Sequence, residues 1–232
     1  MKILAVDTST VVATCAISDE EKVLGEFSLN QQVTHSENLV PMIKEMMDGL
    51  NLNIKDIDFF AGAVGPGSFT GIRIGIATIK GFAHVTKKKV IGVSTLEGLA
   101  FNVPYAKIVI PMIDGRRNRV YTGIYGWEKG KLLSMGNEKI IDIDDFLRDL
   151  DIGFEKIVFN GDGALKYKEK IMNILKERAI FSPINLNMPR ASGIGELAMV
   201  KINEGKAVDC YSLVPKYLRE AQAQMDLIKR GY

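Results

Sequence analysis

The residues of this sequence that could perform chemistry are few and widely spaced. His35 and His84 are its only histidines, and neither belongs to a His-x-x-x-His or His-Glu-x-x-His pattern that could hold a metal ion. Cys15 and Cys210 are its only cysteines, too few for a disulfide framework or a zinc module. No Gly-x-Ser-x-Gly motif marks a serine nucleophile. We therefore expect no catalytic set and no metal site.

An internal repeat is the most informative pattern in the chain. A shift of 107 positions aligns segment 3–17 with segment 110–124, and both read as an apolar strand, an acid, a polar turn and a second alternating strand. A shift of 96 positions aligns the glycines of segment 65–67 with those of segment 161–163, each after an apolar strand and before a helix. Two landmarks in the same order indicate a duplicated domain.

The acids of the two repeats, Asp7 and Asp114, are candidate nucleotide-binding residues. A strand–acid–turn–strand unit used twice is typical of the actin, hexokinase and Hsp70-like (ASKHA) fold, in which two domains face each other across a cleft. Backbone amides of a tight turn can bind an anion there, and an acid can hold Mg2+ through water. Thr8 and Ser9 complete the first turn. This turn lacks the glycines that let phosphates approach closely, so the alternative is a vestigial turn that binds nothing.

The glycine-rich segment 65–75 has the composition of a nucleotide loop but not its spacing. A Walker loop requires Gly-Lys-Ser/Thr five residues after its first glycine, where this sequence has Thr70-Gly71-Ile72, and a dinucleotide fingerprint requires glycine in place of Thr70. Gly71 and Gly75 are instead one helical turn apart and flank Ile74. Glycines at this spacing let another backbone come close, so we interpret the segment as a helix-packing surface.

A helix is expected to begin at segment 34–37, whose Thr-x-x-Glu pattern is typical of a capping box. This helix carries an apolar stripe at helical spacing, rich in methionine, a side chain that adapts to irregular partners. Two interpretations remain open at this point: the stripe packs in the core, or it binds a partner protein. The stripe consists of Leu39, Met42, Ile43, Met46, Met47 and Leu50.

Alternating strand and helix patterns predict an α/β protein with two βββαβαβα-type domains of the duplicated ASKHA fold. In this interpretation residues 1–103 form the N-terminal domain and residues 104–232 the C-terminal domain, whose tail helix from about residue 215 packs back on the first. Strands are expected over 2–7, 12–18, 22–29, 58–64 and 89–93, and helices over 68–85, 143–150, 164–178, 193–203 and 214–228.

The composition excludes several classes of protein. Hydrophobic residues make up 47% and charged residues 25% of the 232 residues, which is ordinary for a globular protein and excludes intrinsic disorder. The longest uncharged stretch, 59–72, has 14 residues and is too short to span a membrane. The net charge of +2 is too small for a free-standing nucleic-acid binder. Because the N-terminus also lacks a secretory signal, we expect a cytoplasmic protein.

Four segments of the sequence resemble the bacterial TsaB (YeaZ) family. They are 3–9 (ILAVDTS), 34–37 (THSE), 65–75 (GPGSFTGIRIG) and 215–219 (PKYLR), and the similarity runs in order along essentially the whole chain. The resemblance implies two actin-like domains and a role in making threonylcarbamoyladenosine in tRNA, beside the anticodon. It also implies that the first two helices pair with the transferase TsaD, or with a second copy of this chain when TsaD is absent.

TsaD-type proteins carry a His-x-x-x-His metal pair, whereas the residue four positions after His35 is Leu39. The resemblance therefore implies a non-catalytic subunit that dimerises with TsaD and activates the transfer of threonylcarbamoyl from its adenylate to adenosine. The chain then has no cofactor of its own. ATP and Mg2+ serve the assembled complex, which includes the TsaE ATPase and binds tRNA. The implied partner interface is Leu39, Met42, Ile43, Met46, Met47, Leu50, Gly71, Ile74 and Gly75.

A stand-alone nucleotide-dependent kinase or hydrolase of the actin-like fold is the alternative function. The missing phosphate-binding glycines and catalytic groups favour the non-catalytic subunit. They also give no support to a glycoprotease, because such an enzyme needs a nucleophile or a metal site. ATP turnover by the purified chain alone would discriminate between the two hypotheses.

Overall fold

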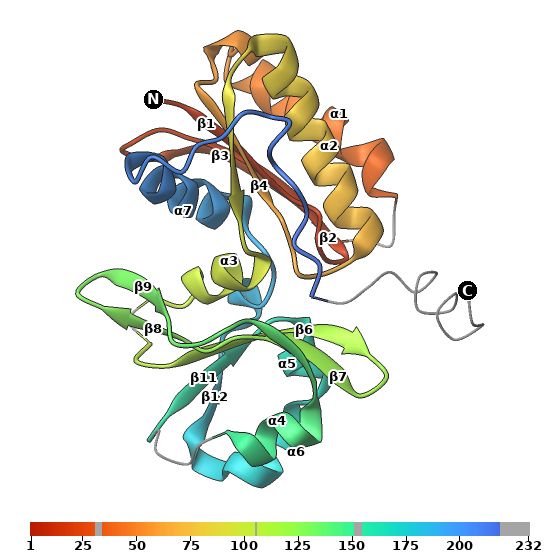
Figure 1. The fold of residues 1–232 in the computed structure, drawn as a ribbon, viewed down its shortest axis with the longest axis vertical. Coiled ribbons are helices and arrows are strands. Elements are labelled where there is room, and N and C mark those ends of the chain that lie inside the picture. Colours follow the sequence, from red (N-terminus) through yellow and green to blue (C-terminus); the bar gives the residue numbers. More distant parts are fainter. Residues whose placement is uncertain (31–33, 105, 151–154, 219–232) are drawn as a thin grey trace.

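The computed structural model describes residues 1–30, 34–104, 106–150 and 155–218, which form two α/β domains stacked along the long axis (Figure 1). The first sheet has the strand order β3-β2-β1-β4-β5, and the main path of the second is β10-β7-β6-β11-β12. In both sheets the first three strands pair antiparallel and the next two join in parallel. This repeated topology confirms the predicted duplicated ASKHA-like fold.

The first domain places its sheet between two layers of helices. Strand β1 is central and buried along its whole length, as its continuous apolar run requires. Helices α1 and α2 lie side by side on one face of the sheet (Figure 1). The elements are β1 (Ile3–Asp7), β2 (Val12–Ser18), β3 (Val23–Asn30), α1 (His35–Gly49), a short 3-10 turn η1 (Ile54–Asp56), β4 (Phe59–Ala63), α2 (Phe69–Thr86), β5 (Lys89–Val93) and α3 (Thr95–Phe101).

The second domain repeats this plan with one addition, the hairpin β8–β9 on the side of β6. Its core lies between the sheet and helices α4 to α6 and contains Phe146 and Phe159. The elements are β6 (Val109–Arg116), β7 (Arg119–Thr122), β8 (Tyr125–Glu128), β9 (Lys131–Ser134), β10 (Lys139–Asp142), α4 (Ile143–Asp149), β11 (Ile157–Asn160), α5 (Asp162–Lys166), α6 (Lys168–Leu175), η2 (Lys176–Arg178), β12 (Ala179–Phe181), η3 (Ile184–Leu186) and α7 (Ala191–Asn203).

The last helix of each repeat packs on the sheet of the other domain. Helix α3 ends the first repeat, but its Leu96 and Leu99 belong to a buried cluster with Val109 of β6. Helix α7 ends the second repeat, but its Ile194 packs with Ile3 of β1. The predicted boundary at Pro104 is therefore too simple, because the first sheet is covered on one face by residues that follow position 190.

Two smaller expectations are also corrected. The Thr34 side chain makes no capping hydrogen bond at the start of α1, where the Glu37 amide instead donates to the Thr34 carbonyl. Residues 214–218 are not helical, and the rest of the expected tail helix lies outside the described residues. Among the residues that the structure describes, no helix has both the length and the apolar character needed to cross a membrane.

Candidate functional site

The first hairpin turn is built around a buried carboxylate. Asp7, at the end of β1, is 1% exposed, and its Oδ1 accepts hydrogen bonds from the Ser9 amide at 2.8 Å and the Ser9 hydroxyl at 2.6 Å. Its Oδ2 is buried and has no hydrogen-bond partner. Burial raises the pKa of Asp7 from 3.8 to about 6, against the Ser9 hydrogen bonds and His35, which favour the charged form. This carboxylate orders the turn.

The glycine-rich start of α2 packs directly beneath this turn. The Thr8 hydroxyl donates to the Gly71 carbonyl at 2.7 Å, and the Ser68 amide donates to the Ser9 carbonyl at 2.6 Å. A Cβ atom added to Gly71 would lie 2.0 Å from the Thr8 carbonyl oxygen, and one added to Gly75 would lie 2.6 Å from the Thr8 hydroxyl. The prediction that Gly71 and Gly75 admit a partner helix is therefore wrong, because the backbone that they admit is the chain's own first turn.

A cavity of about 660 Å3 lies between this turn and the second domain. The predicted nucleotide-binding residues Asp7, Thr8, Ser9 and Asp114 are not among the residues that line it. Its walls are mainly apolar. Among the described residues that line it, the one charged side chain is Asp162, which is acidic, so these residues offer no cation to a phosphate. The lining residues are Thr10, Val11, Val12, Asn30, Leu99, Asp162, Leu165, Ile184, Asn185, Asn187, Met188 and Pro189.

The acid of the second repeat is engaged in local structure. Asp114 Oδ2 forms an ion pair with Lys166 Nζ at 2.7 Å, and its Oδ1 accepts from the Arg116 amide at 2.9 Å. The Asp114 amide in turn donates to Asp162 Oδ1 at 3.2 Å. The two repeats therefore each bring an acid to a turn, but neither Asp7 nor Asp114 reaches the cavity between the domains.

Both histidines make structural contacts. His35 Nε2 donates to the Thr10 carbonyl at 2.8 Å and so ties the start of α1 to the first hairpin turn. His84 Nδ1 is hydrogen-bonded to the Tyr211 hydroxyl at 3.0 Å. In the described part of the chain, no three His, Cys, Asp or Glu side chains are grouped so that they could hold a metal ion.

The apolar stripe of α1 lies in the core of the first domain. Leu39, Ile43 and Met46 are at most 2% exposed, and Met47 is 7% exposed. The stripe packs against both the sheet and α2, which explains why it spans a wide part of the α1 surface. The interpretation of these four residues as a partner surface is therefore wrong. The remaining three residues of the implied interface, Met42, Leu50 and Ile74, are half-buried and pack against the same core.

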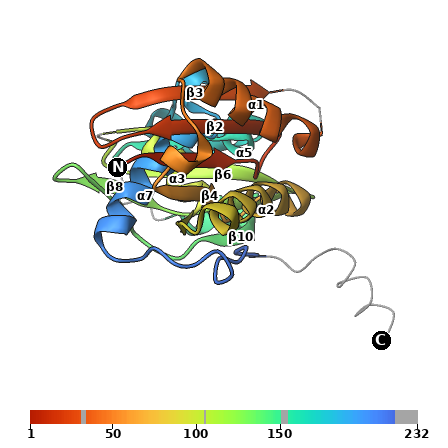
Figure 2. The same ribbon diagram turned by 90° about the horizontal axis from the view of Figure 1, so that it is seen from above.

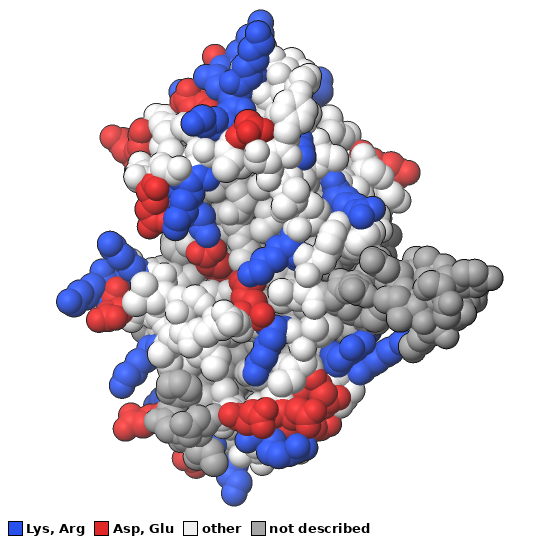
Figure 3. All heavy atoms as spheres, viewed as in Figure 1, with Lys and Arg blue, Asp and Glu red and all other residues white. Residues whose placement is uncertain are grey.

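The opposite side of α2 carries a row of exposed residues, two of which are small. Arg73, Ala77, Gly81 and Val85 are exposed and follow one another at intervals of one helical turn; we call them the outer ridge. A Cβ atom on Gly81 would meet nothing within 4 Å, and Val85 is 76% exposed. Helix α2 contains only two charged side chains, Arg73 and Lys80, and Figure 3 shows a broad uncharged surface on this domain. The phase of the isoleucines in α2 could have identified this ridge from the sequence.

Comparisons with known proteins match this chain to a TsaD family model and to curated TsaB proteins. The TsaD family model, described as tRNA N6-adenosine threonylcarbamoyltransferase, matches residues 22–227. The tRNA threonylcarbamoyladenosine biosynthesis protein TsaB of Bacillus subtilis is 31% identical over 230 residues, which cover 99% of each chain. TsaB of Escherichia coli is 35% identical over 128 residues, 54% of this chain and 55% of that protein.

Solved structures extend the comparison to the fold. YeaZ from Pseudomonas aeruginosa superposes with a TM-score of 0.80 at 27% identity, covering 94% of this chain and 99% of that one. Component A of the (R)-2-hydroxyglutaryl-CoA dehydratase of Acidaminococcus fermentans has a TM-score of 0.53 at 13% identity, covering 88% and 99% of the two chains. The second similarity shows the fold alone.

Proposed function

The chain belongs to the TsaB (YeaZ) family, with a role in tRNA threonylcarbamoyladenosine biosynthesis, and we propose that its role there is that of a non-catalytic subunit. In this proposal the chain forms a heterodimer with TsaD and activates it. TsaD then transfers threonylcarbamoyl from its adenylate to adenosine. TsaE and tRNA join through the complex, and ATP and Mg2+ are used by the assembly. In the absence of TsaD, two copies of the chain pair through the same face.

The observation that carries this proposal is the outer ridge of α2. Ala77 and Gly81 lack the side-chain bulk that would keep a second helix at a distance, so the backbones of two helices can approach closely there. Val85, at 76% exposed, supplies an apolar contact at the end of the ridge, and Arg73 supplies a cationic one at its start. The helix pairing expected for the family thus moves from the buried residues Gly71 and Gly75 to this ridge.

The chain's chemistry agrees with a subunit that depends on a partner. Its two histidines are 49 positions apart. His35 is hydrogen-bonded to the first hairpin turn, and His84 is hydrogen-bonded to Tyr211. The 660 Å3 cavity beside the first hairpin turn has an acidic rather than a basic charge among its described lining residues. These features disfavour the alternative, a nucleotide-dependent kinase or hydrolase, since such an enzyme must neutralise phosphate charge.

The experiment compares two substitutions on the outer ridge with one elsewhere. Gly81→Leu fills the small-residue gap, and Val85→Asp places a charge in the contact. Each should weaken binding to TsaD about tenfold or more in calorimetry, because a helix contact loses close packing or buries an unpaired charge. Val200→Asp is the matched control, since Val200 of α7 is 53% exposed and lies off the ridge. Unchanged affinity in both ridge variants would show that the partner binds elsewhere.

Activity is measured with the same proteins. With TsaD, TsaE, ATP, Mg2+ and the adenylate-forming enzyme, the wild-type chain should restore tRNA modification, and the two ridge variants should restore less at limiting concentration. The purified chain alone should neither modify tRNA nor turn over ATP. Turnover by a preparation free of TsaD would instead support the stand-alone enzyme.

A further inference from the structure

The segment 207–218, which we call the strap, returns along the first domain after α7. It begins as an isolated bridge in which the Val90 amide donates to the Val208 carbonyl at 2.8 Å. Leu213 is buried in the core of the first domain, and its carbonyl accepts from Lys80 Nζ of α2 at 3.0 Å. Figure 2 shows this segment, in blue, along the edge of the molecule beside α2. The strap is thus held by both a strand and a helix of the first domain.

The end of the strap reaches the outer ridge. Tyr217 stacks on Phe69, the first residue of α2, with ring centroids 4.7 Å apart. The Tyr217 hydroxyl accepts a hydrogen bond from Arg73 Nε at 2.8 Å, and the Arg73 guanidinium lies 3.8 Å from the centre of the Phe69 ring. Since Arg73 is the first residue of the outer ridge, Tyr217 fixes the position of a side chain that a partner on this ridge would meet.

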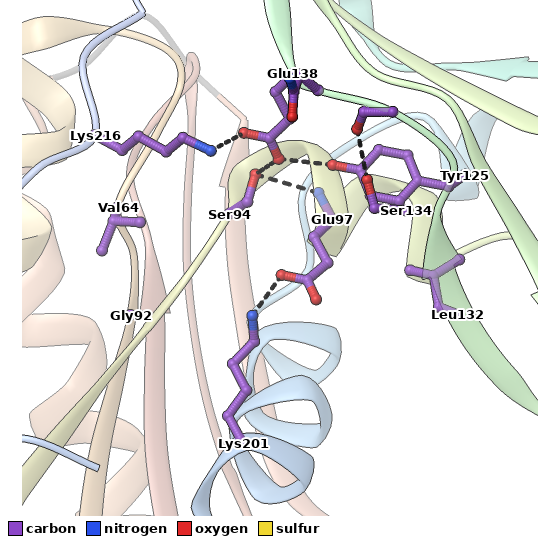
Figure 4. A pocket seen from close by; sticks show the side chains of 12 residues that line it. Val64, Gly92, Ser94, Glu97, Tyr125, Leu132, Ser134, Glu138, Lys201 and Lys216 are labelled. Atoms are coloured by element: carbon purple, nitrogen blue, oxygen red, sulfur yellow. Dashed lines mark hydrogen bonds and ion pairs between the residues drawn. The ribbon is translucent and has the colours of Figure 1, made fainter. Parts of the chain in front are cut away.

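The residue before Tyr217 connects the strap to the second domain. The Lys216 amide donates to the Val64 carbonyl at 2.7 Å, within the first domain. Its Nζ forms an ion pair with Glu138 Oε2 at 2.9 Å, from the connection between β9 and β10 (Figure 4). Lys216 of the strap therefore contacts both domains.

The Glu138 carboxylate that pairs with Lys216 is itself held in place by burial and hydrogen bonds. Its side chain is only 8% exposed. Its Oε1 accepts hydrogen bonds from the Tyr125 hydroxyl at 2.6 Å and from the Ser94 hydroxyl, which also caps α3 (Figure 4). The carboxylate thus has two neutral donors from the joint between the domains and one cation, Lys216. Because a largely buried charge depends on its counter-ion, Lys216 and the strap are part of this joint.

The cavity around this cluster is about 370 Å3 and carries a balanced set of charges. Lys201 of α7 forms a second ion pair with Glu97 of α3 at 2.7 Å, between the two helices that the domains exchange. The four charged side chains among its described lining residues, Glu97, Glu138, Lys201 and Lys216, thus form two ion pairs. Their arrangement is that of a joint between domains, and each of these four described charges has an oppositely charged partner.

We propose that the Lys216–Glu138 ion pair is a clasp that couples the arrangement of the two domains to the outer ridge. When the clasp is closed, Lys216 holds Tyr217 against Phe69 and Arg73. When the second domain moves away from the strap, the grip on Tyr217 is lost and Arg73 loses its fixed position. Binding of TsaD to the ridge and the relative position of the domains therefore bias one another. This inference rests on the proposed function, because it takes TsaD as the protein that binds the ridge.

The test uses two substitutions that open the clasp without touching the ridge. Lys216→Met removes the cation, and Glu138→Gln removes the charge but keeps an oxygen for Tyr125 and Ser94. In the free protein, the Lys216 amide should exchange with deuterium faster in both variants. Affinity for TsaD should fall about fivefold, the scale expected for a partly buried ion pair acting indirectly. The double variant should lose no more affinity than either single variant, because both remove the same contact.

Lys170→Met is the matched control. It breaks the Lys170–Asp144 ion pair of 2.7 Å within the second domain and should change neither exchange at Lys216 nor affinity. Unchanged exchange in the clasp variants would overturn the clasp, and faster exchange with unchanged affinity would overturn its coupling to the ridge. A wild-type chain that does not bind TsaD would overturn the proposed function and the coupling with it, whereas the exchange measurement would still report whether Lys216 and Glu138 hold the strap.

Discussion

At the scale of single residues, the Asp7 carboxylate orders the first turn although burial disfavours its charged form. Two hydrogen bonds from Ser9 reach one of its oxygens, while the other is buried without a partner. The pKa of about 6 reports that burial outweighs these hydrogen bonds. A phosphate-binding turn would need this group to face solvent or a metal ion. In this chain it instead organises the turn on which Thr8 and Gly71 pack.

The raised pKa of Asp7 predicts a specific pH dependence of stability. A folded-state pKa of about 6 against 3.8 means that the folded chain favours the protonated acid, so stability falls as pH rises from about 4 through 6. Asp7→Asn removes this titration and keeps an acceptor for Ser9. The free energy of unfolding of the variant relative to wild type should therefore increase by about 2 to 3 kcal/mol between pH 4 and pH 8.

Urea unfolding at several pH values measures this difference directly. Ser192→Ala serves as a control for pH effects elsewhere, because it changes a neutral side chain that contacts Glu26 away from the first turn. If the difference in free energy of unfolding between wild type and Asp7→Asn does not change with pH, the Asp7 carboxylate is solvated in solution.

At the scale of elements, helix α2 carries two pairs of small residues on different sides. Gly71 and Gly75 face inward, where Thr8 fills the space that a side chain would occupy. Ala77 and Gly81 face outward, on the ridge that we propose as the partner surface. The spacing is the same one helical turn in both pairs, so only the phase of the helix relative to the sheet separates an internal packing site from a surface.

The same substitution should have opposite effects at the two glycines. Gly71→Ala places a Cβ 2.0 Å from a backbone oxygen, which cannot move away cheaply, so we expect a loss of about 2 kcal/mol or more of stability. Gly81→Ala places a Cβ in open space within a helix and should add about 0.5 to 1 kcal/mol, since alanine is the better helix former. Thermal and urea unfolding of the two variants give the signs. Equal effects would contradict this account of the helix phase.

At the scale of the whole molecule, the two domains are joined by more than a linker. Each repeat gives its last helix to the other sheet, and the strap returns to the first domain after α7. Ile194 and Leu197 of α7 complete the core around Ile3 and Ile91. The two domains are therefore interdependent for stability.

A chain cut at the predicted boundary tests this interdependence. The fragment 1–103 lacks α7 and the strap, so the sheet face around Ile3, Ala61 and Ile91 would be exposed to water. Exposed apolar surface costs about 25 cal/mol per Å2, so the fragment should show no cooperative thermal transition by circular dichroism, whereas the full chain should. A sharp transition in the fragment near the melting temperature of the full chain would show that the first domain folds alone.

Local patterns in the sequence were sufficient for the duplicated fold and for the strands of the first domain, but not for strands β8, β9 and β10 or for the division of the expected helix 164–178 into α5, α6 and η2. Strands β2 and β5 begin and end where the alternating apolar residues place them. The strand–acid–turn–strand repeat and the glycine landmarks depend on short-range backbone preferences, which are visible in a few neighbouring residues. The family resemblance depended on segments of this kind, and the comparisons confirm it.

Only the tertiary structure decided which faces of these elements are surface. Met46 and Gly71 are of residue types that are common in binding surfaces, but the sheet buries Met46 and the first turn covers Gly71. Gly81, in contrast, lies on the surface. The exchange of α3 and α7 and the meeting of Lys216 with Glu138 join residues that are far apart in the chain. The periodicity of a helix shows that it has an apolar side. Whether that side packs in the protein's own core or binds a partner protein depends on long-range packing, which no local pattern encodes.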